Sequence, residues 1–177
     1  MDQHLRDVLQ HLVENDSTPI LITGSDTRRR TDWARAILEE RSGLDGVVIL
    51  ESDRDWERAE EADVDAVVVP SLAAVDDERQ NTLLTWVTEG TRVVAAGAAN
   101  PDKAVTEQEI RVDLYYRLNL APLPLDEFEA TRQRPPDEVL SDALANRAGA
   151  EGGVNAPIFG RSAPGATPIW WMASYGR

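Results

Sequence analysis

The chain has 177 residues, of which 42% are hydrophobic, and it carries a net charge of -14 from 32 acidic and 18 basic residues. This length suits one compact domain with a continuous core, and the acidic excess argues against direct binding to nucleic-acid phosphates. Without cysteine, disulfides and thiolate metal sites are excluded. No apolar run is long enough to span a bilayer and the N-terminus does not resemble a signal peptide, so we expect a cytoplasmic protein.

Only one of the 18 basic residues, Lys103, is a lysine. Two explanations stay open for this acidic, lysine-poor composition. It is typical of a protein from a salt-rich cytoplasm, where ionic strength screens the self-repulsion, and it is equally typical of a GC-rich genome that favours arginine.

Short apolar runs alternate with segments of helical periodicity along the first 125 residues. The expected helices cover residues 2–15, 31–41, 53–62 and 76–89. The expected strands cover residues 20–23, 46–50, 66–69, 92–96 and 120–125. This alternation predicts an α/β fold, a three-layer sandwich with a mostly parallel five-stranded sheet covered on both faces. The fifth strand contains prolines, which places it at the sheet edge.

The chain changes character after the fifth strand. Arg134-Pro135-Pro136 interrupts it, residues 137–147 predict one helix, and residues 149–176 are rich in Gly, Ala and Pro. We therefore expect an α/β core over residues 1–125 and a C-terminal part over residues 126–177 that packs on this core.

Two adjacent tryptophans, Trp170 and Trp171, lie in this C-terminal part. They have two interpretations. They pack back on the domain or cover a sheet edge, or they form a contact with a protein partner, since tryptophan is favoured at interface hot spots.

The segment from Ile110 to Asn119 reads IRVDLYYRLN. It resembles the FREDLYYRLN segment in the AAA+ domain of sigma-54-dependent transcription activators, ring-forming ATPases that remodel the sigma-54 RNA polymerase. The resemblance extends over residues 1–125 and implies a P-loop NTPase-like AAA+ core. It aligns Arg111 and Arg117 with two arginines that reach the neighbouring subunit's ATP. The alternative is a helix kept for packing alone, with Asp113 and Arg117 as an i, i+4 ion pair.

The turn after the first strand reads GSDTRRRT and is similar to the family's phosphate loop, GEPGTGKE. Of the loop glycines only Gly24 remains, and Arg30 takes the lysine position. A residual nucleotide or anion site would consist of Gly24, Arg28, Arg29, Arg30 and Thr31. A solvated basic patch is the alternative, and it is favoured if Asp26 caps the following helix and closes the loop.

The carboxylates that such ATPases need are missing. The resemblance places Pro70 and Ser71 where the family has Asp-Glu for Mg²⁺ and water activation. It places Ala98 where the family has a phosphate-sensing Asn. Asp76 and Asp77 follow closely, but they fit the capping of the next helix better. We therefore expect no metal site.

Two further parts of the family domain are absent. The short segment from Ser52 to Val64 leaves no room for the insertion that carries the GAFTGA loop, and the helical lid is missing or reduced. We therefore expect a pseudo-ATPase without cofactor, monomeric or dimeric rather than hexameric.

Such a protein would act through a protein partner as a regulatory or scaffold module in transcription control. One candidate partner is an intact AAA+ activator, and neither nucleic acid nor a membrane is expected as a partner. The alternative is a protein that binds a nucleotide or anion at Gly24–Thr31 without hydrolysing it.

Overall fold

The computed structural model describes residues 2–41, 46–62 and 64–151. Trp170 and Trp171, named above as a packing or partner contact, lie outside the described residues.

One five-stranded sheet forms the centre of the molecule, in the order β2-β3-β4-β1-β5. The strands are β1 (Ile20–Thr23), β2 (Val47–Ile49), β3 (Ala66–Val69), β4 (Val93–Ala98) and β5 (Pro122–Pro124). All neighbouring strands run parallel, which confirms the predicted α/β class. The proline-containing β5 lies at the sheet edge as expected, because an edge strand leaves one row of backbone groups unpaired.

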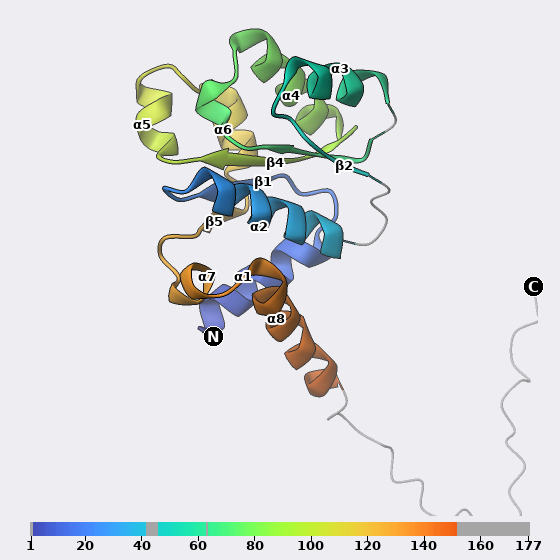
Figure 1. The fold of residues 1–177 in the computed structure, drawn as a ribbon, viewed down its shortest axis with the longest axis vertical. Coiled ribbons are helices and arrows are strands. Elements are labelled where there is room, and N and C mark those ends of the chain that lie inside the picture. Colours follow the sequence, from blue (N-terminus) through green and yellow to red (C-terminus); the bar gives the residue numbers. More distant parts are fainter. Residues whose placement is uncertain (1, 42–45, 63, 152–177) are drawn as a thin grey trace, which may run out of the picture.

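Helices cover both faces of this sheet (Figure 1). One layer contains α1 (Gln3–Glu14), α2 (Thr27–Glu40) and α8 (Pro136–Glu151). The other contains α3 (Asp53–Glu61), α4 (Asp77–Glu89) and α6 (Val112–Leu118). The short helices are α5 (Pro101–Thr106) and α7 (Glu129–Gln133), with a 3₁₀ turn at Leu72–Ala74.

The two faces of the strands divide the core into two clusters. In β1, Ile20 and Ile22 pack against the layer of α1 and α2, whereas Leu21 packs against the layer of α4 and α6. In β3, Val68 and Val69 face the two layers in the same way. Because successive strand residues point to opposite faces, strands that are apolar throughout bury both.

The second helix begins four residues earlier than predicted, at Thr27 rather than Thr31. Its start is fixed by Asp26, whose carboxylate accepts the backbone N–H of Arg29 at 3.1 Å. The arginines that were expected in a loop therefore lie in the first helical turn.

Two helices were not predicted, α5 and α7. Both are too short to show a periodic apolar pattern. The start of α5 nevertheless carries a local signal, since Asn100 caps Lys103 N–H at 3.0 Å and Pro101 occupies the first helical turn.

Among the described residues, no helix is long and apolar enough to cross a membrane.

Gly97 in β4 is required by its neighbours. A Cβ atom at this position would lie 2.4 Å from the carbonyl oxygen of Pro70 and 2.9 Å from Nε of Arg30. We expect Gly97→Ala to lower the free energy of unfolding by about 1 to 3 kcal/mol, because backbone must move to accept the methyl group. Urea unfolding of the purified variant measures this loss.

Gly46→Ala is the matched control, since nothing lies within 4 Å of a Cβ added there. Its free energy of unfolding should change by no more than about 0.5 kcal/mol. Equal losses in the two variants would contradict the close approach at Gly97.

Candidate functional site

The carboxyl ends of the parallel strands meet at one edge of the sheet, where ligands bind in open α/β folds. Gly24 follows β1, Pro70 follows β3, Ala98 ends β4, and Asp126 stands two residues after β5. The segments that the sequence pointed to as phosphate loop and metal position are therefore brought together here.

The turn after β1 is tight and closes directly onto α2. Gly24 has a φ of +150°, a conformation that residues with a side chain rarely adopt, so this position favours glycine. Asp26 then caps α2. A loop closed in this way favours a solvated basic patch over an anion site.

Arg30 turns inward from α2 and lies over the ends of the strands. Arg30 is only 2% exposed. Its guanidinium donates hydrogen bonds to the carbonyl oxygens of Gly24 and Pro70, the latter at 3.2 Å. It also donates to Thr27 Oγ1 at 2.9 Å. Burial lowers the pKa of Arg30, partly offset by the charges of Asp26 and Asp126.

The other residues of the proposed loop site point elsewhere. The Arg28 side chain is 92% exposed and pairs with Asp32 at 4.0 Å. Thr31 donates its hydroxyl to the carbonyl oxygen of Thr27, 3.0 Å away within its own helix. The three consecutive arginines therefore do not converge on one ligand position.

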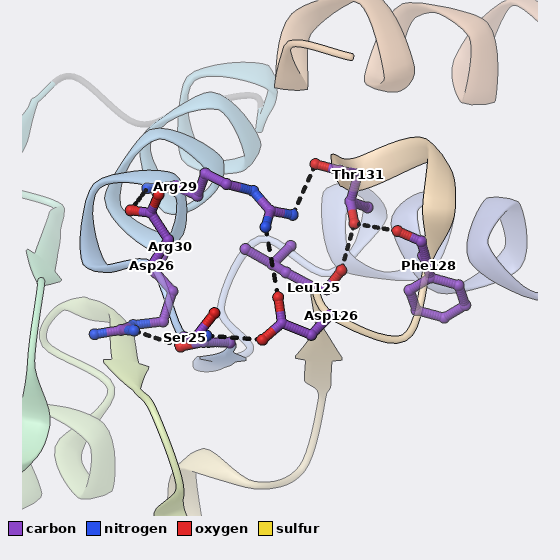
Figure 2. A network of polar contacts seen from close by, with 9 residues as sticks. Ser25, Asp26, Arg29, Arg30, Leu125, Asp126, Phe128 and Thr131 are labelled. Carbon is purple, nitrogen blue, oxygen red and sulfur yellow. Dashed lines mark hydrogen bonds and ion pairs between the residues drawn. The ribbon is translucent and has the colours of Figure 1, made fainter. Parts of the chain in front are cut away.

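Arg29 joins a network with the segment after β5 (Figure 2). Its guanidinium lies 3.4 Å from Oδ1 of Asp126 and donates to the carbonyl oxygen of Thr131 at 2.9 Å. The second carboxylate oxygen of Asp126 accepts the backbone N–H of Ser25 at 2.8 Å. Local sequence patterns give no signal for Asp126 as a site residue, because its partners are about a hundred residues away.

The positions aligned with the Mg²⁺ ligand and the water-activating acid carry no ionisable group. Pro70 and Ser71 follow β3, and Ala98 ends β4. Asp76 caps α4 by accepting the N–H of Arg79 at 2.9 Å, which confirms its predicted capping role. Within the described residues, no group of three or more His, Asp or Glu side chains is arranged to hold a metal ion.

Arg111 is held firmly at the start of α6. Its backbone N–H donates to Oε1 of the buried Gln80 at 2.9 Å, and its guanidinium contacts Asn81 and Asp113. The hydrogen bond from Arg111 lowers the pKa of Asp113 to about 2. Asp113 forms its ion pair with Arg111, at 2.7 Å. The predicted i, i+4 ion pair between Asp113 and Arg117 is therefore wrong. Arg111 precedes the helix, and its side chain folds back over the first helical turn.

Arg117 lies on the exposed surface of α6 and has no hydrogen bond or ion pair with the described residues. Beside it is an apolar stripe, which we call the α6 face: Val112, Tyr116 and Leu120, exposed by 54%, 67% and 70%. These side chains are four residues apart and so share one side of the helix and the turn after it. No other large hydrophobic side chain of the described residues is exposed in this way.

The α6 face and the turn after β1 are two separate places. Leu114 and Leu118 of α6 pack in the cluster of α3 and α4, whereas Trp33 and Ile37 of α2 pack in the cluster on the opposite face of the sheet. The structure therefore does not bring Arg111 or Arg117 together with Arg28, Arg29 and Arg30 in one site.

The strand order and the turn that leads from β1 into a helix define a P-loop NTPase-like α/β core, as found in AAA+ domains. Within this class, residues 62–124 match the sequence model of the sigma-54 interaction domain. The matched segment contains β3, β4, α6 and the α6 face, while the turn after β1 precedes it. No curated protein matches the chain.

Arg30 should contribute much more to stability than its neighbour Arg28. Arg30→Ala leaves two inward carbonyl groups without their donor and opens a gap between α2 and the sheet, so we expect a loss of about 2 to 4 kcal/mol in the free energy of unfolding. Arg28→Ala removes an exposed pair and should cost no more than about 0.5 kcal/mol. Urea unfolding of both variants compares them, and equal losses would rule out the buried role of Arg30.

Proposed function

We propose that the protein is a catalytically inactive sigma-54-activator-like AAA+ domain that acts through protein contacts as a regulatory or scaffold module in transcription control. The observation that carries this proposal is the position of Arg30. Its guanidinium bonds to the carbonyl oxygen of Pro70, at the very place where the family resemblance puts the Mg²⁺-binding acid.

Hydrolysis of ATP needs a cation that reaches the terminal phosphates and an acid that binds the metal or orients the attacking water. In this chain the aligned cation is bound to backbone oxygens inside the protein, and Pro70 and Ser71 offer no carboxylate. The geometry therefore supports a protein without its own phosphoryl-transfer chemistry.

Protein contact is supported by the α6 face. Three exposed apolar side chains beside an exposed cation form a surface suited to a partner that offers apolar side chains and a carboxylate. The family resemblance places the same helix where one subunit of an activator ring meets the next, so an intact activator is the partner that we propose to test first.

Purified protein should show no Mg²⁺-dependent ATP hydrolysis above background. A turnover of about one per minute would require substantial stabilisation of the transition state. Phosphate release from wild type, Arg30→Ala and Arg28→Ala measures this. A turnover that Arg30→Ala abolishes and Arg28→Ala retains would overturn the proposal.

Calorimetry with ATP, ADP, GTP and cyclic dinucleotides separates inactivity from binding. We expect no heat of binding at millimolar ligand. Heat that disappears in Arg29→Ala would favour the second candidate function, binding of a nucleotide or anion at Gly24–Thr31 without hydrolysis. The closed turn, with Asp26 as helix cap, is the observation against that candidate.

If the α6 face works in a ring, the protein should enter the ring of an intact activator and act as a dominant-negative regulator. Arg117 would still supply a cation to the neighbour's ATP, while the mixed ring lacks GAFTGA loops at some positions. We therefore expect open-complex formation to fall more than ATP turnover when a several-fold excess is added. Both activities are measured in one mixture with the sigma-54 polymerase.

Arg117→Ala is the sharper variant for this test, because it removes an exposed side chain without an ion pair and should change stability by no more than about 0.5 kcal/mol. Arg111→Ala also disturbs the start of α6 and needs a stability control. Arg35→Ala, on the opposite layer, is the matched control and should behave as wild type. If neither activity moves, or if the double Arg111→Ala, Arg117→Ala variant acts like wild type, the finger role is excluded.

A further inference from the structure

A carboxylate from a distant segment lies at the mouth of the turn after β1. Asp126 accepts the backbone N–H of Ser25 at 2.8 Å and the guanidinium of Arg29 at 3.4 Å (Figure 2). A free backbone N–H before a helix together with an arginine is the donor set that binds phosphates in other proteins. Here both donors already hold an anion, and it belongs to the chain itself.

The same network reaches the beginning of the C-terminal helices. Arg29 donates to the carbonyl oxygen of Thr131, and Thr131 Oγ1 lies 2.6 Å and 2.7 Å from the carbonyl oxygens of Leu125 and Phe128. Thr131 is only 2% exposed. Arg29 therefore connects Asp126 to the backbone of α7, which leads into α8, and the buried Thr131 hydroxyl ties α7 to the segment after β5.

The C-terminal helix depends on how this segment is placed. In α8, Val139, Leu140 and Ala143 are fully buried and share a cluster with Leu5 of α1 and Trp33 of α2. A latch that fixes the chain between β5 and α7 fixes the direction from which α8 meets that cluster.

We infer that Asp126 is an internal anion that occupies the turn after β1 and latches the segment from β5 to α7 onto α2. The inference rests on the proposed function in one respect, that the turn binds no nucleotide. It adds that Asp126 holds the turn where a nucleotide phosphate would otherwise bind. An external oxyanion must displace a carboxylate of the same chain, which has a high effective concentration at this turn. The native protein therefore binds phosphate only weakly there.

The charge of Asp126 fits this role. The backbone N–H of Ser25 is the main cause that lowers the pKa of Asp126, with smaller contributions from Arg29 and Arg132. Because the folded-state pKa lies below the unfolded value, the stabilisation is present above the ordinary carboxyl pKa of about 4 and fades as the pH falls below it.

The test compares Asp126→Ala with Glu127→Ala. The second variant is the control, because Glu127 is the next residue, carries the same charge and has an exposed side chain. Thermal unfolding of the full chain is followed during titration with inorganic phosphate, against sodium chloride at equal ionic strength. We expect Asp126→Ala to lower Tm by about 2 to 4 °C. On the order of 50 mM phosphate should recover more than half of this loss by binding the vacated donors.

Wild type and Glu127→Ala should gain no more from phosphate than from chloride. The double variant Asp126→Ala, Arg29→Ala should lose the recovery, because it lacks the cationic donor. A phosphate effect that is equal in wild type and Asp126→Ala, or no larger than that of chloride in Asp126→Ala, would overturn the inference.

Asp126→Asn is a second variant for the case that Asp126→Ala does not fold. It keeps an oxygen for the N–H of Ser25 and loses the charge that faces Arg29, so phosphate should still raise its Tm more than chloride does. If phosphate does not recover the Tm of these variants, the inference about Asp126 fails, but the ATPase and mixing results still stand. If the wild type hydrolyses ATP, the proposed function fails, but the phosphate recovery still stands. The two outcomes are therefore distinguishable.

Discussion

The burial of one arginine without a carboxylate partner is the constraint on which the site depends. Arg30 carries its charge into the ends of the strands and meets carbonyl oxygens from Gly24 and Pro70 instead of an acid. Burying an unpaired charge is costly, and hydrogen bonds to fixed carbonyl dipoles offset that cost only while their geometry is kept. The tight turn at Gly24 and the bare backbone of Gly97 provide the space and the orientation that this guanidinium needs.

The same arrangement closes the turn after β1 with contacts from within the chain. In an intact ATPase of this class a phosphate and a metal ion would hold the turn, the strand ends and the following helices in register. Here a cation from α2 and the carboxylate of Asp126 hold them, so the contacts are internal. The α6 face belongs to the other layer and is braced separately, by Gln80 against the N–H of Arg111 and by Asp102 against the hydroxyl of Tyr115. The turn after β1 and the α6 face are therefore held by separate sets of contacts.

What could be predicted from the sequence follows from local pattern. Apolar runs such as Ala66–Val69 and Ile20–Thr23 predicted buried parallel strands, and the structure has them at those residues. The start of α2 was missed because an Asp cap and three arginines give little apolar periodicity, although Asp26 itself was available as a signal. The pairing of Asp113 was predicted with the wrong arginine, since helical spacing does not describe a residue that folds back from outside the helix.

The sequence by itself determined the α/β class, the edge position of β5 and the match of residues 62–124 to the sigma-54 interaction domain, because these depend on periodicity and on residues close together along the chain. Only the tertiary structure decided where the three consecutive arginines point, one to solvent, one to Asp126 and one into the sheet. It also decided that Asp126 reaches Ser25, a contact across 101 residues. The physical reason is that neighbours on one helical turn leave it in different directions, and each finds its partner in whichever strand end or loop the folded sheet places there.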